Sequence, residues 1–449
     1  MAKSSSATLM TEGSIWKHLL FFAIPIFWGN LFQQLYNAAD SLIVGNFLGS
    51  AALAAVSSSG NLIFLMVGFF NGLAMGAGVV ISRYFGAGDM KNMKKAIHTT
   101  VAVGFFCGII LTIIGVVAAP QILVLIGTPA EVLPNSITYF RIYFMGSVAF
   151  VMYNCCVGVL QSVGDSKHPL IYLIISSVVN IVLDLLFIGV FHMGVGAAAA
   201  ATIISQFISA ILCIWHLIKG PEETKLHLKE LRIHKDLLSQ ILKNGIPAGV
   251  NNSIISIANV FVQSNINSFG ALAVAGCGAY AKIQGFAFLP VTCFTMALAT
   301  FISQNLGAKK VARVKKGVAY GVFACMIAAE LIGICSNILA PHLIALFDRT
   351  PEVIAYGVQY AKTDTLFYFL LAFSHCMAAI FRGAGKATVP MYVMMIFWCF
   401  VRVGYISIIL KFIPEIGMIF WAYPLTWALS SIVFLIYYFK GNWMGVAAE

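Results

Sequence analysis

The heptapeptide ISRYFGA at residues 81–87 returns as ISQNLGA at residues 302–308, 221 positions further along the chain. Other landmarks recur at an offset of 221 to 222. Ile24-Pro25 returns as Ile246-Pro247, Gly49 as Gly270, Gly164 as Gly385 and Pro169 as Pro390. Several landmarks in one order at one spacing indicate the duplication of a structural unit.

The sequence around these landmarks is apolar. Of the 449 residues, 60% are hydrophobic and 10% are charged, whereas about 25% of the residues in a soluble domain are charged. Because about 20 apolar helical residues cross a bilayer, we expect twelve spans near residues 15–43, 52–79, 95–119, 136–160, 168–191, 194–218, 240–268, 273–300, 313–338, 354–380, 388–411 and 415–439. A membrane β-barrel needs shorter, alternating segments. The first span has no small-residue cleavage site, so we expect it to be retained.

An even number of helices per copy gives both copies the same orientation in the membrane. The predicted fold is an all-α polytopic membrane protein with twelve transmembrane helices in two six-helix bundles related by a pseudo-twofold axis along the membrane normal. We expect an N-terminal lobe at 1–218, a cytoplasmic linker at 219–239 and a C-terminal lobe at 240–449. Two such bundles can expose a cavity between them to either side in turn, which favours a transporter over a channel or a membrane enzyme.

The net charge of +11 follows the topology of the chain rather than a nucleic-acid surface. Positive residues concentrate in the cytoplasmic loops of membrane proteins. Twenty-one of the 27 lysines and arginines fall on one predicted side, including the clusters at 91–95 and 309–316. Both termini are therefore predicted to be cytoplasmic, and we expect no nucleic-acid partner.

Nearly all of the ten cysteines lie inside the apolar spans, and none forms a CxxC pair. Buried cysteines of this kind are usually packing residues. The sequence contains no catalytic nucleophile motif, no cofactor-binding motif and no metal-ligand spacing. We therefore expect no metal, no cofactor and no enzymatic activity.

Polar residues within the first six spans suggest a cation site. A carboxylate at the middle of a membrane is costly and is a functional candidate by default. Asp40 lies on span one, Asn180 and Asp184 lie one turn apart on span five, and Thr202 lies on span six. Supporting polar residues on the same helices are Gln33, Asn37 and Gln206. This oxygen-rich set suits Na⁺, whereas two neighbouring carboxyls also suit a proton. A hydrogen-bond network that only holds the helices together is the structural alternative.

The duplication supplies an internal comparison for this polar group. At an offset of 221, Asp40 corresponds to Phe261, Asp184 to Tyr405 and Thr202 to Tyr423. None of these positions keeps an acid. A network needed only to hold six helices together should recur in the second copy, so its loss favours ion coupling by the first lobe alone.

The second half carries other charged residues within its spans. Lys282, Glu330, Asp364 and Arg402 are predicted either to form structural ion pairs with one another or to contact substrate. Proline removes a helical hydrogen bond and permits a kink. Pro25 and Pro247 open the first span of each half, and Pro25 is the better hinge candidate because its helix also carries Asp40.

The chain resembles the multidrug and toxic compound extrusion (MATE) transporters in its twelve spans, its paired Ile-Pro openings, its Gly-Ala turns after spans two and eight, and its first-lobe acids. The resemblance implies a coupling-cation site at Asp40, Asn180, Asp184 and Thr202. The NorM-like branch places an acid on span seven, where residues 246–268 offer six amides but no acid. The chain is thus more similar to the DinF-like branch. Asp364 resembles the family's acid on span ten.

The resemblance also implies a function. We expect a secondary active antiporter that exports amphipathic, often cationic, small molecules or drugs in exchange for Na⁺ or H⁺ by alternating access. It should be a monomer in the plasma membrane whose partners are an organic substrate and the lipid bilayer. Within transport, the alternative is a lipid-linked oligosaccharide flippase of the same superfold, which should have a strongly cationic cavity. A membrane enzyme or a channel is the alternative of a different class.

Overall fold

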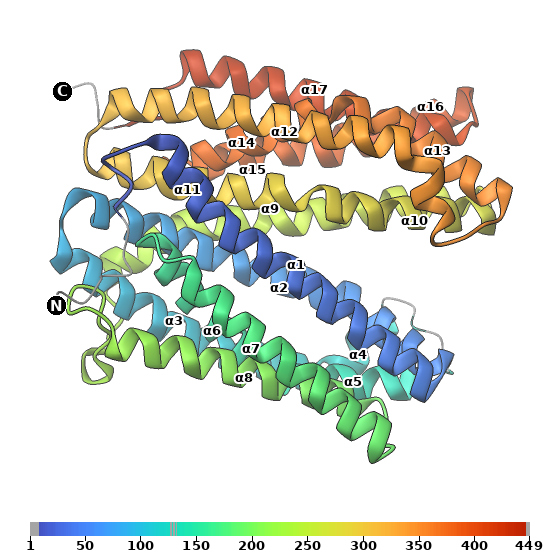
Figure 1. Cartoon of the computed structure of the whole chain (residues 1–449), viewed down its shortest axis with the longest axis horizontal. Helices are drawn as coiled ribbons and strands as arrows, with labels where there is room; N and C mark the ends of the chain where they lie inside the picture. Colours follow the sequence, from blue (N-terminus) through green and yellow to red (C-terminus); the bar gives the residue numbers. More distant parts are fainter. Residues whose placement is uncertain (1–8, 126–127, 129–130, 132, 446–449) are drawn as a thin grey trace. The chain divides into compact units, whose positions relative to one another are not determined.

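The computed structural model of the chain describes residues 9–125, 128, 131 and 133–445, and most side chains between residues 50 and 66 fall outside this description. The described residues form helices and no strands, as expected of an all-α protein. Figure 1 shows the helices in chain order. Ten helical stretches among the described residues are long and apolar enough to cross a membrane, or eleven if the bent pair of α5 and α6 counts as one span. The helix α2, which contains the expected span 52–79, is not among the ten.

The chain divides into two compact units. Unit 1 is built on Pro25–Gly245, and unit 2 on Met10–Ile24 together with Ile246–Glu449. The helices of the first half are α1 (Ile15–Leu48), α2 (Ser50–Ala87), α3 (Met90–Val117), α4 (Ala119–Leu125), α5 (Leu133–Met145), α6 (Ser147–Ser162), α7 (Lys167–Asp184), which continues as the π-helix η1 (Leu185–Val190), and α8 (Gly196–Lys219).

The second half repeats this order with different breaks. Its helices are η2 (Leu228–Glu230), α9 (Lys235–Asn267), α10 (Ala271–Ala287), α11 (Leu289–Gly307), α12 (Val311–Ala345), α13 (Pro351–Asp364), η3 (Thr365–Phe367), α14 (Tyr368–Gly383), α15 (Thr388–Met394), η4 (Met395–Val401), α16 (Arg402–Phe412) and α17 (Ile416–Lys440).

The backbone turns carry the repeat seen in the sequence. Gly49 and Gly270 have φ values of 84° and 94°, and Gly164 and Gly385 have φ values of 87° and 77°. This left-handed region favours glycine because a Cβ atom crowds the backbone there. Both pairs are separated by the 221-residue offset. The duplication therefore repeats at the level of single backbone angles.

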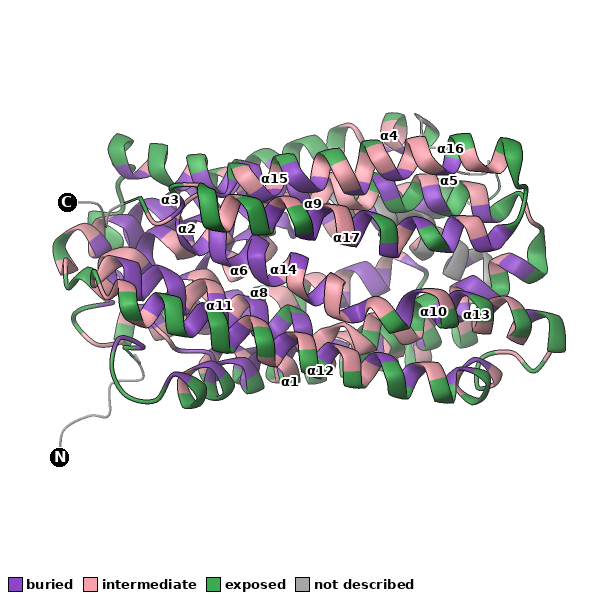
Figure 2. Cartoon of the chain, turned by 90° about the horizontal axis from the view of Figure 1, so that it is seen from above, coloured by how far each residue is buried: buried purple, intermediate pink, exposed green. Residues whose placement is uncertain are grey.

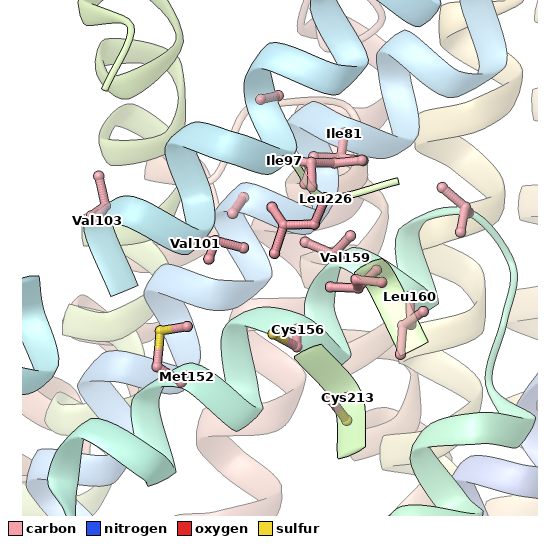
Figure 3. Close-up of a cluster of buried hydrophobic side chains, with 14 of the residues drawn as sticks. Ile81, Ile97, Val101, Val103, Met152, Cys156, Val159, Leu160, Cys213 and Leu226 are labelled. Atoms are coloured by element: carbon pink, nitrogen blue, oxygen red, sulfur yellow. The ribbon is translucent and has the colours of Figure 1, made fainter. Parts of the chain in front are cut away.

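Unit 1 has a core of buried hydrophobic side chains. Ile81 of α2, Ile97 and Val101 of α3 and Cys156 of α6 are buried against one another and against Cys213 of α8 (Figure 3). Leu226, Leu237 and Ile241 join the same core, so part of the expected linker at 219–239 packs into unit 1. Burial of apolar side chains is the main stabilising term for such a core.

Each long helix buries one stripe and exposes another, as the alternating purple and green bands of Figure 2 show. Bulky apolar residues such as Phe106, Ile113 and Val117 of α3 are more than half exposed. Exposed apolar surface of this extent is typical of a helix that faces lipid. Polar side chains on such helices must then face protein or a water-filled cavity rather than lipid.

Candidate functional site

Two acids of unit 1 come together from different helices. Asp40 is half-buried near the end of α1, and Asp184 is fully buried in the last turn of α7. The two carboxyl groups lie close enough for one to hydrogen-bond the other when it carries a proton. The helices α1 and α7 thus bring together residues 144 positions apart, as the sequence predicted for a shared polar face.

The atoms around this pair lack protein partners. Both carboxyl oxygens of Asp184, Oδ1 of Asp40 and both side-chain polar atoms of Asn180 are buried without a geometrically formed hydrogen bond to another described residue. Asn180 is 1% exposed and lies one turn before Asp184 on α7. Leaving a buried polar group unpaired costs about 1–3 kcal/mol. These three neighbouring polar side chains are therefore a candidate binding site for a cation that is coordinated by oxygen atoms.

Tyrosines surround the acids. Tyr139 of α5 is 5% exposed and lies within electrostatic reach of both Asp40 and Asp184. Its ring stacks on that of Tyr143, one turn later, with 6.2 Å between the two ring centroids. Tyr36 of α1 lies one turn before Asp40 and interacts with Gln33. The sequence reasoning missed these hydroxyls because tyrosine is common in helical cores, although the spacing of Tyr36 and Asp40 was a readable signal.

The remaining predicted residues of the first lobe take different positions. The Thr202 hydroxyl donates to the Ala198 carbonyl of α8 at 3.0 Å. Gln206, one turn after Thr202, has a buried side-chain oxygen without a hydrogen bond among the described residues. The Asn37 side chain is exposed. Four of the predicted residues therefore carry buried polar atoms without a hydrogen bond among the described residues: Asp40, Asn180, Asp184 and Gln206.

The chemistry of this group fits a hard monovalent cation or a proton. Carboxylate, amide and hydroxyl oxygens are the ligands that hard cations prefer. A carboxyl pair also holds a single proton between its oxygens, since the charged form of each is disfavoured by burial and by the other. None of these side chains supplies a nucleophile or a soft metal ligand.

Asp364 belongs to a separate, fully paired network in unit 2. It is fully buried at the end of α13, where it accepts hydrogen bonds from the Tyr280 hydroxyl and from Gln284 Nε2, the latter at 2.8 Å. The Tyr280 hydroxyl also lies 2.8 Å from that of Tyr368. Two donors offset part of the cost of burying this carboxyl group.

The predicted ion pairing of Lys282, Glu330, Asp364 and Arg402 is wrong, because no ion pair joins any two of these described side chains. Arg402 is 1% exposed and instead donates to Thr426 Oγ1 at 2.8 Å while its guanidinium lies over the Tyr423 and Trp398 rings. Such aromatic faces stabilise a cation.

Glu330 and Lys282 have other partners as well. Glu330 of α12 accepts a hydrogen bond from the Phe369 backbone N–H, which the helix break at η3 leaves available. Exposed Lys282 lies over the Phe347 ring, 5.5 Å from its centroid. Spacing along one sequence indicates which residues are intramembrane but not which of several neighbours each will face.

Pro25 lies within the continuous helix α1, and Pro247 lies within α9. The two compact units divide between Ile24 and Pro25 and again between Gly245 and Ile246. Each proline thus stands where its helix passes from one unit to the other.

Comparison with known proteins gives the family. The MatE sequence profile matches twice, over residues 25–186 and 247–407. "Probable multidrug resistance protein YpnP" of Bacillus subtilis is 30% identical over 434 residues, covering 96% of this chain and 97% of that protein. "Probable multidrug resistance protein YoeA" of the same organism is 27% identical, with 95% and 94% of the two chains covered.

Solved structures support the same fold. A structure described as MATE in the bent conformation matches with a TM-score of 0.92 at 22% identity and covers 99% of each chain. A superfamily transporter from Pyrococcus furiosus matches with a TM-score of 0.91 at 22% identity over 99% of each chain. The two profile matches confirm the duplication, and the chain belongs to the MatE family of membrane transporters rather than to an enzyme family.

Proposed function

We propose that the chain is a secondary active antiporter that exports amphipathic, often cationic, small molecules or drugs in exchange for Na⁺ or H⁺. The observation that carries this proposal is the cluster of Asp40, Asn180 and Asp184, in which Oδ1 of Asp40 and both side-chain polar atoms of Asn180 and of Asp184 are buried without a hydrogen bond in the described structure. The relatives are named as probable multidrug resistance proteins, which supports export of drug-like molecules.

The cation would act by alternating access. A ligand shifts a conformational equilibrium only by its difference in affinity for the two states. Asp40 stands on α1, which contains Pro25, whereas Asp184 stands on α7. A change in the bend of α1 alters the distance between these carboxyls, so a cation that needs both would favour one bend over the other. Thr202 and Gln206 on α8, with Gln33 and Asn37 on α1, would complete the polar surroundings.

The first lobe would couple alone, as in the DinF-like branch. Asp364 has its own donors, and residues 246–268 of α9 carry no acid. We further propose twelve transmembrane helices in two bundles, with lobes at 1–218 and 240–449 joined by the segment 219–239. Both termini would be cytoplasmic in the plasma membrane, and the chain would work as a monomer.

The flippase alternative is less well supported. An anionic lipid-linked sugar requires a cluster of unpaired cations, whereas the unpaired buried side-chain atoms in the described part of unit 1 belong to acids, amides and threonines and to no lysine or arginine. The buried Arg402 already faces Thr426 and two aromatic rings.

The test is the flux of a fluorescent organic cation in proteoliposomes under an imposed Na⁺ gradient or an imposed pH gradient. We expect one of the two gradients to drive uptake in the wild type. Asp40→Asn and Asp184→Asn should each lower driven flux at least about tenfold, which corresponds to about 1.4 kcal/mol of lost coupling.

Asp236→Asn is the matched control, because Asp236 is an exposed acid in the first turn of α9. Its flux should equal that of the wild type. Driven flux that persists in both Asp40→Asn and Asp184→Asn contradicts the assigned site, and flux that responds to neither gradient contradicts antiport.

A further inference from the structure

A second cluster in unit 1 lies away from the cation pair, at the other end of α7. Asp165 follows Gly164 in the turn between α6 and α7, His168 is in the first turn of α7, and His216 is in the last turn of α8. Asp165 is 3% exposed, although it stands in a turn. The sequence predicted no metal site, because His216 comes from a different helix and lies far along the chain from Asp165 and His168.

The two imidazoles converge on a single carboxylate oxygen. Asp165 Oδ2 lies 2.7 Å from His168 Nδ1 and 3.6 Å from His216 Nε2, and the three atoms all lie within 4.8 Å of one another. A hydrogen bond accounts for the 2.7 Å contact. It does not account for the second nitrogen, since 3.6 Å exceeds hydrogen-bond length.

These separations approach those of a metal centre. Ligands at about 2.0–2.1 Å from a tetrahedral Zn²⁺ stand about 3.3 Å from one another, a value that lies between the two observed distances. The imidazole rings are 4.1 Å apart, centroid to centroid. Two imidazolium cations so close would repel each other, and a metal requires neutral imidazole.

Two atoms that would not bind the metal, His216 Nδ1 and Asp165 Oδ1, already make hydrogen bonds. Tyr172 Oη lies 3.0 Å from His216 Nδ1, the ring nitrogen opposite to Nε2. Asp165 Oδ1 accepts a hydrogen bond from the His168 backbone N–H at 3.2 Å. Partners of this kind orient metal ligands and fix the histidine tautomer.

The second half of the chain shows that the fold does not need this cluster. Gly385 keeps the left-handed turn of Gly164. At the same offset, however, Asp165 becomes Lys386, His168 becomes Val389 and His216 becomes Tyr437. The turn and the helix pair therefore form without the three polar side chains.

We propose that Asp165, His168 and His216 form a binding site for a divalent transition metal of the Zn²⁺ class, through Oδ2, Nδ1 and Nε2 respectively, with Tyr172 as a positioning residue. Two imidazoles and one carboxylate suit Zn²⁺, Co²⁺ and Ni²⁺ better than Mg²⁺ or Ca²⁺. The metal would fasten the start of α7 to the end of α8. The site is independent of the proposed antiport.

The test uses the full-length protein in detergent, stripped with a chelator and titrated with Zn²⁺ by calorimetry. We expect one Zn²⁺ per chain. Co²⁺ should give the intense visible absorption of a four-coordinate site, in which water joins the three protein ligands. Asp165→Asn and His216→Gln should weaken Zn²⁺ binding at least about tenfold, and Tyr172→Phe about tenfold through the loss of ligand orientation.

His192→Asn is the matched control, because His192 is exposed and has a φ of 50°, which asparagine tolerates. It should bind Zn²⁺ as the wild type does. If His216→Gln fails to fold, Tyr172→Phe alone decides, since it keeps all three ligands. A wild type that binds no Zn²⁺, or variants that bind it equally well, would overturn the proposal and leave a hydrogen-bonded cluster.

Discussion

Asn180 is unusual because an amide inside a membrane helix normally finds a partner. Its nitrogen and its oxygen are both buried, and neither makes a hydrogen bond to another described side chain or backbone group. Lipid offers no substitute for such a bond. An amide kept in this state for packing alone would be replaceable by leucine, whereas an amide kept for a ligand would not be.

We predict that Asn180→Leu separates stability from function. The substitution removes an unpaired buried amide, so the free energy of unfolding should stay the same or rise by about 1 kcal/mol. Driven flux should fall, because one oxygen near Asp184 is lost. Thermal unfolding in detergent and proteoliposome flux measure the two effects. A destabilised variant with full flux would show that the amide is structural.

Tyr280→Phe should act in the opposite way in unit 2. The substitution removes the hydroxyl that donates to Asp364 and contacts the Tyr368 hydroxyl. Leaving a buried carboxylate short of a donor should cost about 1–3 kcal/mol. Thermal unfolding measures the loss. Tyr392→Phe is the control, because Tyr392 is 55% exposed, and equal melting temperatures for the two variants would contradict the structural role assigned to Tyr280.

At the scale of elements, the close approach of α2 and the start of α9 depends on two glycines. A Cβ atom on Gly76 would stand 2.3 Å from the backbone nitrogen of Gly245. No side-chain rearrangement can relieve a contact with backbone, so the two helices would have to separate. Leu237 and Ile241, earlier on α9, are buried in the unit 1 core, and they would lose contacts as the helix moved.

We therefore predict that Gly76→Ala destabilises the protein by about 1–3 kcal/mol. Gly285→Ala is the matched control, since a Cβ atom on Gly285 of α10 would meet nothing within 4 Å. Alanine is favoured over glycine within a helix by about 0.5–1 kcal/mol, so the control should be neutral or stabilised. Chemical denaturation of both variants checks the sign, and a stabilised Gly76→Ala would refute the close packing.

At the scale of the molecule, α1 and α9 have the same feature: each helix contains a proline and runs from one compact unit into the other. The helix α1 begins in unit 2 and continues in unit 1 from Pro25, whereas α9 begins in unit 1 and continues in unit 2 from Ile246. A proline inside a helix removes one backbone hydrogen bond and lowers the cost of bending there. We therefore expect the helices to bend at Pro25 and Pro247.

Pro25→Ala should slow transport without abolishing substrate binding. The added N–H restores a helical hydrogen bond and stiffens α1, so driven flux should fall about tenfold if bending limits turnover. Substrate affinity measured by fluorescence should stay within about twofold of the wild type. Pro341→Ala is the control, because Pro341 is an exposed proline within α12. Unchanged flux in Pro25→Ala would exclude the hinge.

Much of the molecule was predictable from the sequence. The all-helical fold followed from continuous apolar runs, and the duplication followed from landmarks such as Gly49 and Gly164, whose backbone angles recur in Gly270 and Gly385. The contact of Asp40 with Asp184 followed from the rule that intramembrane acids avoid lipid. These inferences need only periodicity and the cost of burying charge.

The rest depends on three-dimensional packing. An ion pair with an acid was one of the two predictions for Arg402, but its guanidinium lies over the rings of Tyr423 and Trp398 instead. Tyr139 near the acids and His216 near Asp165 come from helices whose facing residues the sequence alone does not pair. Helix rotation and the choice among several polar neighbours are set by shape complementarity, which single-sequence patterns do not encode.

The N-terminal segment imposes an order on biosynthesis. The Met10 backbone N–H donates to Gln304 Oε1, and the Arg313 guanidinium donates to the carbonyls of Met10, Glu12 and Gly13. Residues Met10 to Gly13 must therefore wait for partners that are synthesised some 300 positions later. The stretch Pro25–Gly245 of unit 1 can assemble during translation, whereas unit 2 cannot close until Gln304 and Arg313 have been synthesised and have bound the segment Met10–Gly13.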